Sequence, residues 1–402
     1  MSTLHSYPNI FVHGMLGWAG DDGLNKMAPY WGMLCGNLTE KLSAEGRESY
    51  NVKVGPLSSA WDRACDLYAL LTGTKTDYGK AHSEKFGHNR FGRTYDKPLI
   101  EGWGQPYPNS DGIKKINLIG HSFGGATIRM LVELLTNGSK EEMEATDKED
   151  ISPLFTGGKG EWVHALVAVS APHEGTTLFY AVPPLYKFAS LGTFLMANVL
   201  GNTKLNEGYD WLLDQWGLSS VPRKELPDKT KMFNLKQIQK ALESKDNLWY
   251  DLTLEGAKKV NEIINCNKDT YYFSLAGSMT DEDMLTGHQH HSRHMFPLLW
   301  PLAHEMGKYD HNDVNDIPVD KRWCENDGCL PTISGLHPFD EPFTDYEEAK
   351  AKDDIKKGIW HVMPVQHADH GKIIGGSFDF VGKSHEFTDF YEKLVDMLNN
   401  LK

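Results

Sequence analysis

Residues 116–138 read INLIGHSFGGATIRMLVELLTNG. A short apolar run comes first, a tight turn around Ser122 follows, and a helical pattern then ends at Asn137-Gly138. Strand, turn and helix in this order are what a nucleophile elbow of the form G-x-S-x-G requires. The glycines suit a sharp turn where neighbouring backbones pass close by. The stretch therefore predicts an α/β-hydrolase fold with Ser122 as its nucleophile.

The rest of the chain alternates short apolar runs with helical patterns. Strands are expected at residues 10–12, 116–119, 166–169, 271–276 and 359–363, and helices at 31–42, 60–71, 128–135, 254–264 and 387–401. Such alternation is typical of a mostly parallel central sheet with helices on both faces.

No internal repeat or low-complexity linker divides residues 1–402, so we expect one domain with two insertions. Residues 61–110 are rich in His, Asp, Gly and aromatics and carry little strand signal. Residues 178–230 begin with an apolar segment that Pro183-Pro184 interrupts. That segment predicts either a lid helix, whose apolar face is exposed when a site opens, or a plain core helix.

Composition limits the partners. A formal net charge of −14 disfavours nucleic acid and anionic membranes but not a neutral lipid surface. No apolar run reaches the ~20 residues of a membrane span, so we do not expect an integral membrane protein. The first seven residues are polar, and no secretory signal is expected in them. Five cysteines imply no disulfide framework, and spacing does not show whether Cys324 and Cys329 pair.

A serine nucleophile needs a base and an acid that orients the base. In α/β-hydrolases the acid follows Ser in the chain, and the His comes last. The loop after the strand expected at 359–363 offers His367 and His370, and the earlier loop WCENDG (323–328) offers Glu325 and Asp327. Spacing alone does not choose within either pair.

Two backbone N–H groups must also bind the oxyanion that forms during acyl transfer. One is expected from Phe123, the residue after the nucleophile. The other is expected from Met15, in the loop HGM (13–15) after the first strand.

These motifs together resemble one family. The segments that carry the resemblance are HGMLGW (13–18), VGPLSSAWDRAC (54–65), DYG (77–79), FGRTY (91–95), GHSFG (120–124), APHEGTT (171–177), DQWG (214–217) and ENDG (325–328). They are similar to those of bacterial lipase family I.5, the thermoalkalophilic zinc-containing lipases, and of their staphylococcal relatives. The resemblance implies Ser122, Asp327 and His370 as the triad and suggests a secreted enzyme.

A metal site is also implied. Asp62, His82 and His88 in the first insertion offer a carboxylate and two imidazoles, which are good zinc ligands. In the resembling lipases these positions bind a structural zinc, and the match adds Asp246 as the fourth ligand. Four protein ligands would leave no position for substrate.

Two other segments are not expected to bind a metal ion. The family's calcium site uses acidic residues after the catalytic His, where this chain has Lys372 and Ser377. A lysine ammonium repels calcium, so no calcium is expected there. The segment GHQHHSRH (287–294) is expected to be a solvated or partly packed surface, and we do not count it among the zinc ligands.

The leading hypothesis is therefore a serine carboxylic-ester hydrolase, a lipase or esterase. The resemblance implies triacylglycerols, simple esters and synthetic polyesters as substrates, met at an oil–water or polymer interface. The alternatives are a short-chain esterase without true lipase activity, a metallohydrolase that uses the Asp62/His82/His88 metal, and a non-catalytic lipid-binding protein. Sequence does not indicate the oligomeric state.

Overall fold

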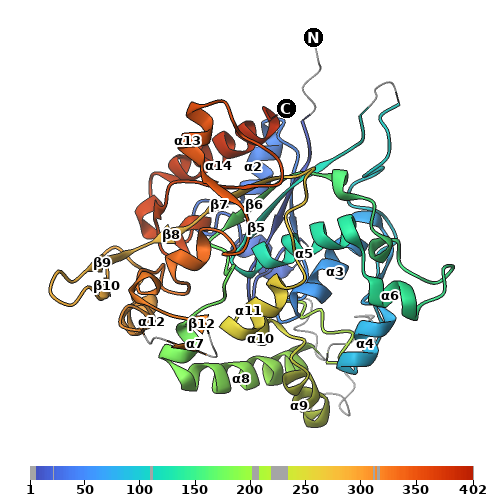
Figure 1. Ribbon diagram of the computed structural model, residues 1–402, viewed down its shortest axis with the longest axis horizontal. Coiled ribbons are helices and arrows are strands. Elements are labelled where there is room, and N and C mark those ends of the chain that lie inside the picture. The colour runs from blue at the N-terminus through green and yellow to red at the C-terminus, as the bar shows by residue number, and fades with distance from the viewer. Residues whose placement is uncertain are drawn as a thin grey trace.

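The computed structural model describes residues 6–20, 22–108, 112–201, 208–218, 234–310, 313–314 and 317–401, built around one seven-stranded sheet (Figure 1). The strands lie in the order β13 (Phe343–Asp345), β14 (Trp360–Val362), β7 (Tyr271–Leu275), β6 (Val163–Val169), β5 (Ile116–His121), β1 (Asn9–Val12) and β2 (Ser49–Val52). Every neighbouring pair is parallel. The expected parallel sheet is thus confirmed, and all five expected strands belong to it.

Helices cover both faces of this sheet, because its strands bury side chains on both sides. Ile10 and Val12 of β1 join the core formed with α3 (Ala60–Thr72) and α5 (Phe123–Asn137). Phe11, between them, points to the opposite core, formed with α2 (Leu38–Ala44) and α14 (Ser384–Asn399). This alternation makes the three-layered arrangement of an α/β-hydrolase.

One expected helix, over residues 31–42, is wrong in its first half. Residues 31–35 form turns, and α2 begins only at Leu38, where the side chain of Asn37 caps it. Gly32 and Gly36 have φ of 108° and 84°, which a right-handed helix does not allow. The N–H of Gly32 instead donates to the carbonyl oxygen of Ile374 at 2.8 Å. A distant loop, rather than a helix, therefore satisfies this backbone.

The first expected insertion contains more regular structure than its sequence indicates. Helix α3 packs along α5, and beyond Thr72 come β3 (Lys75–Asp77), α4 (Lys80–Phe86) and β4 (Phe91–Thr94). Strands β3 and β4 form a small antiparallel sheet that composition did not reveal.

Among its described residues, the second expected insertion contains two helices, α7 (Leu178–Ala181) and α8 (Pro183–Gly201), and α9 (Leu235–Glu243) follows beyond its expected end. Helices α8 and α9 line the edge of the molecule away from the sheet (Figure 1). Residues 202–207 and 219–230 of this insertion lie outside the described residues. Within the described part, no helix has the length and apolar character to cross a bilayer.

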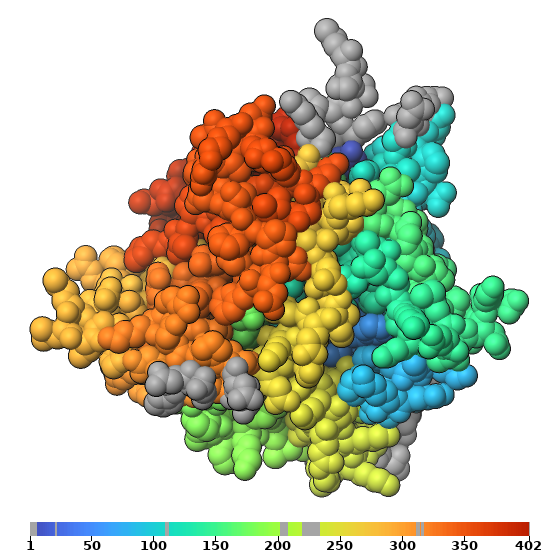
Figure 2. Space-filling view, in the orientation of Figure 1, coloured from blue at the N-terminus to red at the C-terminus, as the bar shows by residue number. Residues whose placement is uncertain are grey.

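Smaller elements complete the fold. They are α1 (Gly23–Met27), α6 (Lys140–Ala145), α10 (Leu248–Asp251), α11 (Leu254–Asn261), β8 (Gly277–Ser278), β9 (Thr280–Glu282), β10 (Gln289–His291), α12 (Trp300–Met306), β11 (Asp313–Val314), β12 (Ile317–Pro318), α13 (Tyr346–Ala351) and β15 (Gln366–His367). The hairpin β9–β10 stands out from one edge of the surface (Figure 2). The loops after β1, β5 and β14 leave the same edge of the parallel sheet, so they meet in space.

Candidate active site and metal centre

Ser122 occupies a strained turn between β5 and α5. Its φ of 55° and ψ of −130° lie outside the regions that non-glycine residues prefer. The two flanking glycines are sterically required. A Cβ on Gly120 would lie 2.5 Å from the carbonyl carbon of Gly124, and one on Gly124 would lie 2.4 Å from the oxygen of Val12. The local sequence therefore builds the elbow geometry that the motif predicts.

Asp327 and His370 are brought together by two hydrogen bonds. The imidazole Nδ1 lies 2.7 Å from Asp327 Oδ2, and the backbone N–H of His370 donates to the Asp327 carbonyl at 2.9 Å. The other carboxylate oxygen, Oδ1, accepts the N–H groups of Cys329 and Leu330 at 3.0 and 2.8 Å. Burial alone would lower the pKa of His370, but the Asp327 charge outweighs it and raises that pKa.

The other two candidates from the sequence lie at the surface. Glu325 and His367 are both exposed, whereas the Asp327 side chain is buried. Of the two acids and two histidines that spacing left open, Asp327 and His370 are the pair that meets.

His370 also lies against the elbow. The Nε2 of His121, the residue before Ser122, lies 3.1 Å from the carbonyl oxygen of His370. The two imidazole rings have centroids 4.6 Å apart. This contact places the Asp327–His370 pair beside the nucleophile loop.

The loop after β1 touches the same serine. A Cβ on Gly14 would lie only 2.6 Å from the Cβ of Ser122, so only glycine allows this approach. Met15 follows in that loop, and Phe123 begins α5. Within the described residues, neither the Met15 N–H nor the Phe123 N–H donates a hydrogen bond to another protein group. Both groups are thus available to bind an oxygen atom.

A buried arginine supports this loop, and the sequence patterns did not identify it. Arg63 is fully buried, and its guanidinium donates to the carbonyl oxygens of His13 and Gly55 and to Thr127 Oγ1. Burial lowers the pKa of Arg63 to about 10. The guanidinium joins the β1 loop to helix α5, which carries Phe123. Arg63 lies within the motif at 54–65, the one signal that could have found it.

The four expected metal ligands come together from four segments of the chain. His82 Nε2 lies 3.4 Å from Asp62 Oδ1 and 3.3 Å from Asp246 Oδ1, and His88 Nε2 lies 3.0 Å from Asp246 Oδ2. All four ligand atoms lie within 4.8 Å of one another. Ligands about 2.0–2.1 Å from a tetrahedral zinc would be roughly 3.3 Å apart. The spacing of these atoms fits such an ion.

The surroundings of these atoms also fit a cation. Asp62 Oδ1, Asp246 Oδ2 and the Nε2 atoms of both histidines are buried, and apart from their contacts with one another they have no hydrogen-bond partners among the described residues. Burial alone would lower the pKa of His82, but Asp246 and Asp62 outweigh it and raise that pKa to about 10. The two buried carboxylates therefore attract positive charge, which a metal ion would supply.

Outer contacts orient the ligands. His88 Nδ1 lies 2.9 Å from the carbonyl oxygen of Asn89, which can only accept, so the proton sits on Nδ1 and leaves Nε2 bare for a metal. Gln215 Nε2 donates to Asp62 Oδ2 at 2.7 Å, and Oδ1 remains for a metal. Gln215 belongs to the DQWG motif, but no local pattern identifies it as a residue of the metal site.

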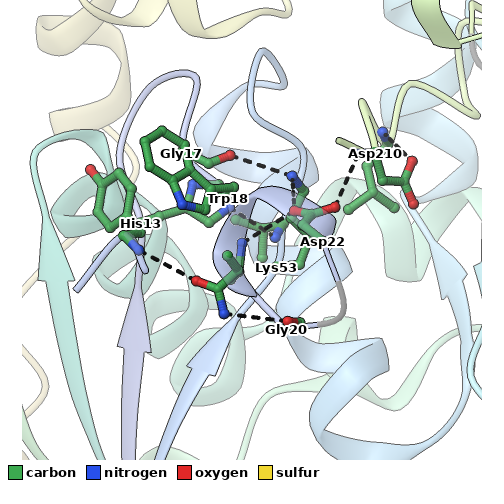
Figure 3. A network of polar contacts seen from close by, with 12 residues as sticks. His13, Gly17, Trp18, Gly20, Asp22, Lys53 and Asp210 are labelled. Atoms are coloured by element: carbon green, nitrogen blue, oxygen red, sulfur yellow. Dashed lines mark hydrogen bonds and ion pairs between the residues drawn. The ribbon is translucent and has the colours of Figure 1, made fainter. Parts of the chain in front are cut away.

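An ion-pair network joins the β1 loop to Asp210 in the segment 208–218 (Figure 3). Asp22 lies between Lys53, whose Nζ is 2.7 Å from Asp22 Oδ2, and Asp210, whose N–H donates to Asp22 Oδ1 at 3.0 Å. Lys53 Nζ also reaches the carbonyl oxygen of Gly17 at 3.4 Å. Arg93 of β4 pairs with Asp210 from the other side. The segment 208–218, which carries Gln215, is therefore anchored to the β1 loop and to β4.

The positions of the family's calcium ligands hold a different pattern. Lys372 Nζ pairs with Asp379 Oδ2 at 2.7 Å. Asp369 Oδ1 accepts the N–H groups of Gly371 and Lys372, and its Oδ2 accepts that of Phe296. The absence of calcium at this place stays a prediction.

The histidine-rich segment packs partly against α12 and partly against its own hairpin. The ring of His291 stacks on Trp300 with centroids 4.5 Å apart, and His290 Nε2 lies 3.5 Å from Asp283. Among the residues that the structure describes, Asp62, His82, His88 and Asp246 are the only group of three or more side chains placed to hold an ion. All five cysteines are free.

Comparisons with known proteins agree with this geometry. The sequence model of the family described as "Lipase-like, C-terminal domain" matches residues 5–402. Lipase 1 of Staphylococcus aureus is 34% identical over 397 residues, which cover 97% of this chain and 54% of that protein. The chain therefore spans about half the length of the curated relatives it matches.

Two solved structures extend the likeness to three dimensions. The lipase of Staphylococcus hyicus has a TM-score of 0.81 and 32% identity, over 98% of this chain and 96% of that one. EstA from Clostridium botulinum has a TM-score of 0.79 and 36% identity, over 99% of this chain and 88% of that one. The resemblance to the staphylococcal and related lipases is confirmed, and the chain belongs to the lipase-like C-terminal domain family of α/β-hydrolases.

Proposed function

We propose that this chain is a serine carboxylic-ester hydrolase, a lipase or esterase, with Ser122, His370 and Asp327 as its triad. The observation that carries the proposal is the Asp327–His370 pair, joined at 2.7 Å and seated beside the strained elbow of Ser122. The family to which the chain belongs supports the same chemistry, since its relatives are named lipases and an EstA.

In the proposed reaction, Ser122 Oγ attacks the carbonyl carbon of the ester. His370 binds Asp327 through Nδ1, so Nε2 is the nitrogen left to take the serine proton and later give it to the leaving alcohol. The buried Asp327 carboxylate holds the ring and stabilises the imidazolium. Water then attacks the acyl-enzyme with His370 as base, releasing the acid and restoring Ser122.

The negative oxygen of each tetrahedral intermediate would lie between the N–H groups of Met15 and Phe123. Both donors are preorganised, because Arg63 joins the Met15 loop to the helix that begins at Phe123. Donors that are already in place need no reorganisation during the reaction, which is why such sites lower the barrier.

Triacylglycerols are the proposed natural substrates, with simple esters and synthetic polyesters as further ones, and α8 as part of a lid. One side of α8 buries Phe194 and Ala197. The other side exposes apolar side chains, with Phe188 at 76% and Leu191 at 44%. A helix that is apolar on both sides suits a segment that meets lipid when it moves. A secreted location, as for a lipase acting at an oil–water or polymer interface, belongs to the same proposal.

Zn²⁺ is the proposed ion for Asp62, His82, His88 and Asp246. Two imidazole nitrogens and two carboxylate oxygens form a closed tetrahedral set, so the ion would serve the fold rather than the reaction. Bound there, it would neutralise the two buried carboxylates and fasten α3 and α4 to the segment before α10.

The test is hydrolysis of p-nitrophenyl esters of increasing length and of emulsified triacylglycerol, with wild type and Ser122→Ala compared. Turnover of the emulsion that disappears in Ser122→Ala is the expected result. Turnover of short soluble esters alone would indicate an esterase on a lipase scaffold. Activity that survives the substitution but stops at once on chelation would favour a metallohydrolase, and no activity on any ester would favour a lipid-binding protein.

A further inference from the structure

Three hydrogen bonds join the β1 loop to the loop that carries His370. The Gly14 N–H donates to the hydroxyl oxygen of Tyr30 at 2.9 Å. That hydroxyl lies 2.7 Å from His121 Nδ1, and His121 Nε2 lies 3.1 Å from the carbonyl oxygen of His370. This series of bonds runs beside Ser122, because His121 precedes that residue and Gly14 lies against its Cβ.

The groups at the two ends of this series, the Gly14 N–H and the His370 carbonyl, determine which group donates in each bond. A backbone N–H can only donate, so Tyr30 accepts from Gly14. A carbonyl oxygen can only accept, so His121 carries its proton on Nε2 and leaves Nδ1 bare. Tyr30 then donates its single proton to Nδ1. Every donor has one acceptor, and a neutral His121 completes the series.

We propose that Tyr30 and His121 are positioning residues. They hold the β1 loop, which carries Met15, and the loop that carries His370 in fixed positions around Ser122. This inference rests on the proposed function, which assigns the oxyanion to Met15 and the base to His370. Neither Tyr30 nor His121 would touch substrate. Their effect would pass through the Gly14 N–H at one end and the His370 carbonyl at the other.

Packing keeps both side chains in these positions. Tyr30 is 6% exposed and His121 is 2% exposed. Aromatic rings of Trp18 and Trp31 pack edge-on against Tyr30, and Trp31 also packs edge-on against His121. Burial lowers the pKa of His121 well below its ordinary value, as a neutral ring requires. Few rotamers are open to either side chain, so the bonds are preorganised.

Loss of the Tyr30 hydroxyl would leave two buried groups without partners, the Gly14 N–H and His121 Nδ1. Both would gain by moving toward another partner, and the Met15 loop would move with Gly14. A shift of about 1 Å at such a site can cost about 100-fold in rate. Since the oxyanion forms only during the reaction, the loss should appear in kcat and not in KM.

The experiment compares Tyr30→Phe with a matched control, Tyr272→Phe. The Tyr272 hydroxyl also accepts a buried backbone N–H, that of Asn267 at 2.8 Å, and the side chain is 2% exposed. Tyr272 lies in β7 and contacts neither catalytic loop through its hydroxyl. Tyr272→Phe leaves one buried N–H without a partner and Tyr30→Phe leaves two groups, so thermal unfolding of both variants is measured beside the kinetics. We expect kcat on a soluble ester to fall about 10- to 100-fold in Tyr30→Phe, with KM within about twofold, and to stay near wild type in Tyr272→Phe.

Substitutions of His121 test the second bond. His121→Leu should lower kcat as Tyr30→Phe does, and the double variant should be little worse than either, because both break one series of bonds. His121→Gln, whose amide can still donate to the His370 carbonyl, should recover part of the rate. Near-wild-type kcat in Tyr30→Phe, or fully additive losses in the double variant, would overturn the inference.

Failure of the proposed function would look different. If Ser122→Ala kept its ester hydrolysis, the triad itself would be wrong, whatever Tyr30→Phe did. If Ser122→Ala were inactive and Tyr30→Phe fully active, the triad would stand and only the positioning role would fall.

Discussion

Asp327→Asn tests the proposed triad most sharply, because the structure determines how the new amide must sit. Two backbone N–H groups, of Cys329 and Leu330, donate to Oδ1 at 3.0 and 2.8 Å. An amide NH₂ at the Oδ1 position would face two N–H donors, so the amide oxygen must occupy that position. The NH₂ group then faces His370 Nδ1 in the place of Oδ2.

This orientation reverses the proton arrangement on His370. Nδ1 has to accept from the amide, so Nε2 carries the ring proton and cannot take the proton of Ser122. A base in the wrong tautomer costs about 10⁴ in kcat in serine hydrolases of this type, about 5 kcal/mol in the barrier. The fold should change little, because the amide keeps the Oδ1 hydrogen bonds and nearly the same volume.

The assay is steady-state hydrolysis of p-nitrophenyl butyrate, with thermal unfolding measured on the same samples. Glu325→Gln is the matched control, since Glu325 is the exposed acid of the same loop. We expect Asp327→Asn to lose about 10⁴ in kcat with little change in Tm, and Glu325→Gln to lose nothing. More than a tenth of wild-type kcat in Asp327→Asn, or a large loss in Glu325→Gln, would contradict the role proposed for Asp327.

Four further predictions follow from other contacts. kcat/KM should rise with increasing pH, and the midpoint of the rise should lie above 6.5, because the raised pKa of His370 keeps the base protonated and inactive at lower pH. A midpoint at or below 6.5 would contradict this. Gly14→Ala should lower stability by about 1–3 kcal/mol and kcat at least 100-fold, since the new Cβ would lie 2.6 Å from Ser122 Cβ; urea unfolding and ester kinetics measure both. Adding calcium should leave Tm unchanged, because Lys372 occupies the place of an acidic ligand; a large rise in Tm that Ser377→Ala removes would show otherwise. Phe188→Ser should reduce turnover of emulsified triacylglycerol and spare soluble esters, and equal losses on both would argue against a lipid-facing α8.

Local sequence patterns predicted much of the sheet and the elbow, because both depend on neighbouring residues. The five expected strands are the five inner strands of the seven-stranded sheet, and Ser122 has the strained backbone that its motif requires. The helix expected from residue 31 failed for a reason outside local sequence. Its backbone pairs with the carbonyl oxygen of Ile374, more than three hundred residues away.

Local sequence patterns were sufficient to predict the nucleophile loop, the class of fold and the residue types able to hold a metal. They left two acids and two histidines open, and a family resemblance rather than spacing singled out Asp327 and His370. Only the tertiary structure joined those two at 2.7 Å and linked Gly14 to His370 through Tyr30 and His121. The difference lies in how far apart along the chain the interacting residues are. Strand and turn preferences act between neighbours, whereas these hydrogen bonds join loops that meet only after parallel strands have aligned their ends at one edge of the sheet.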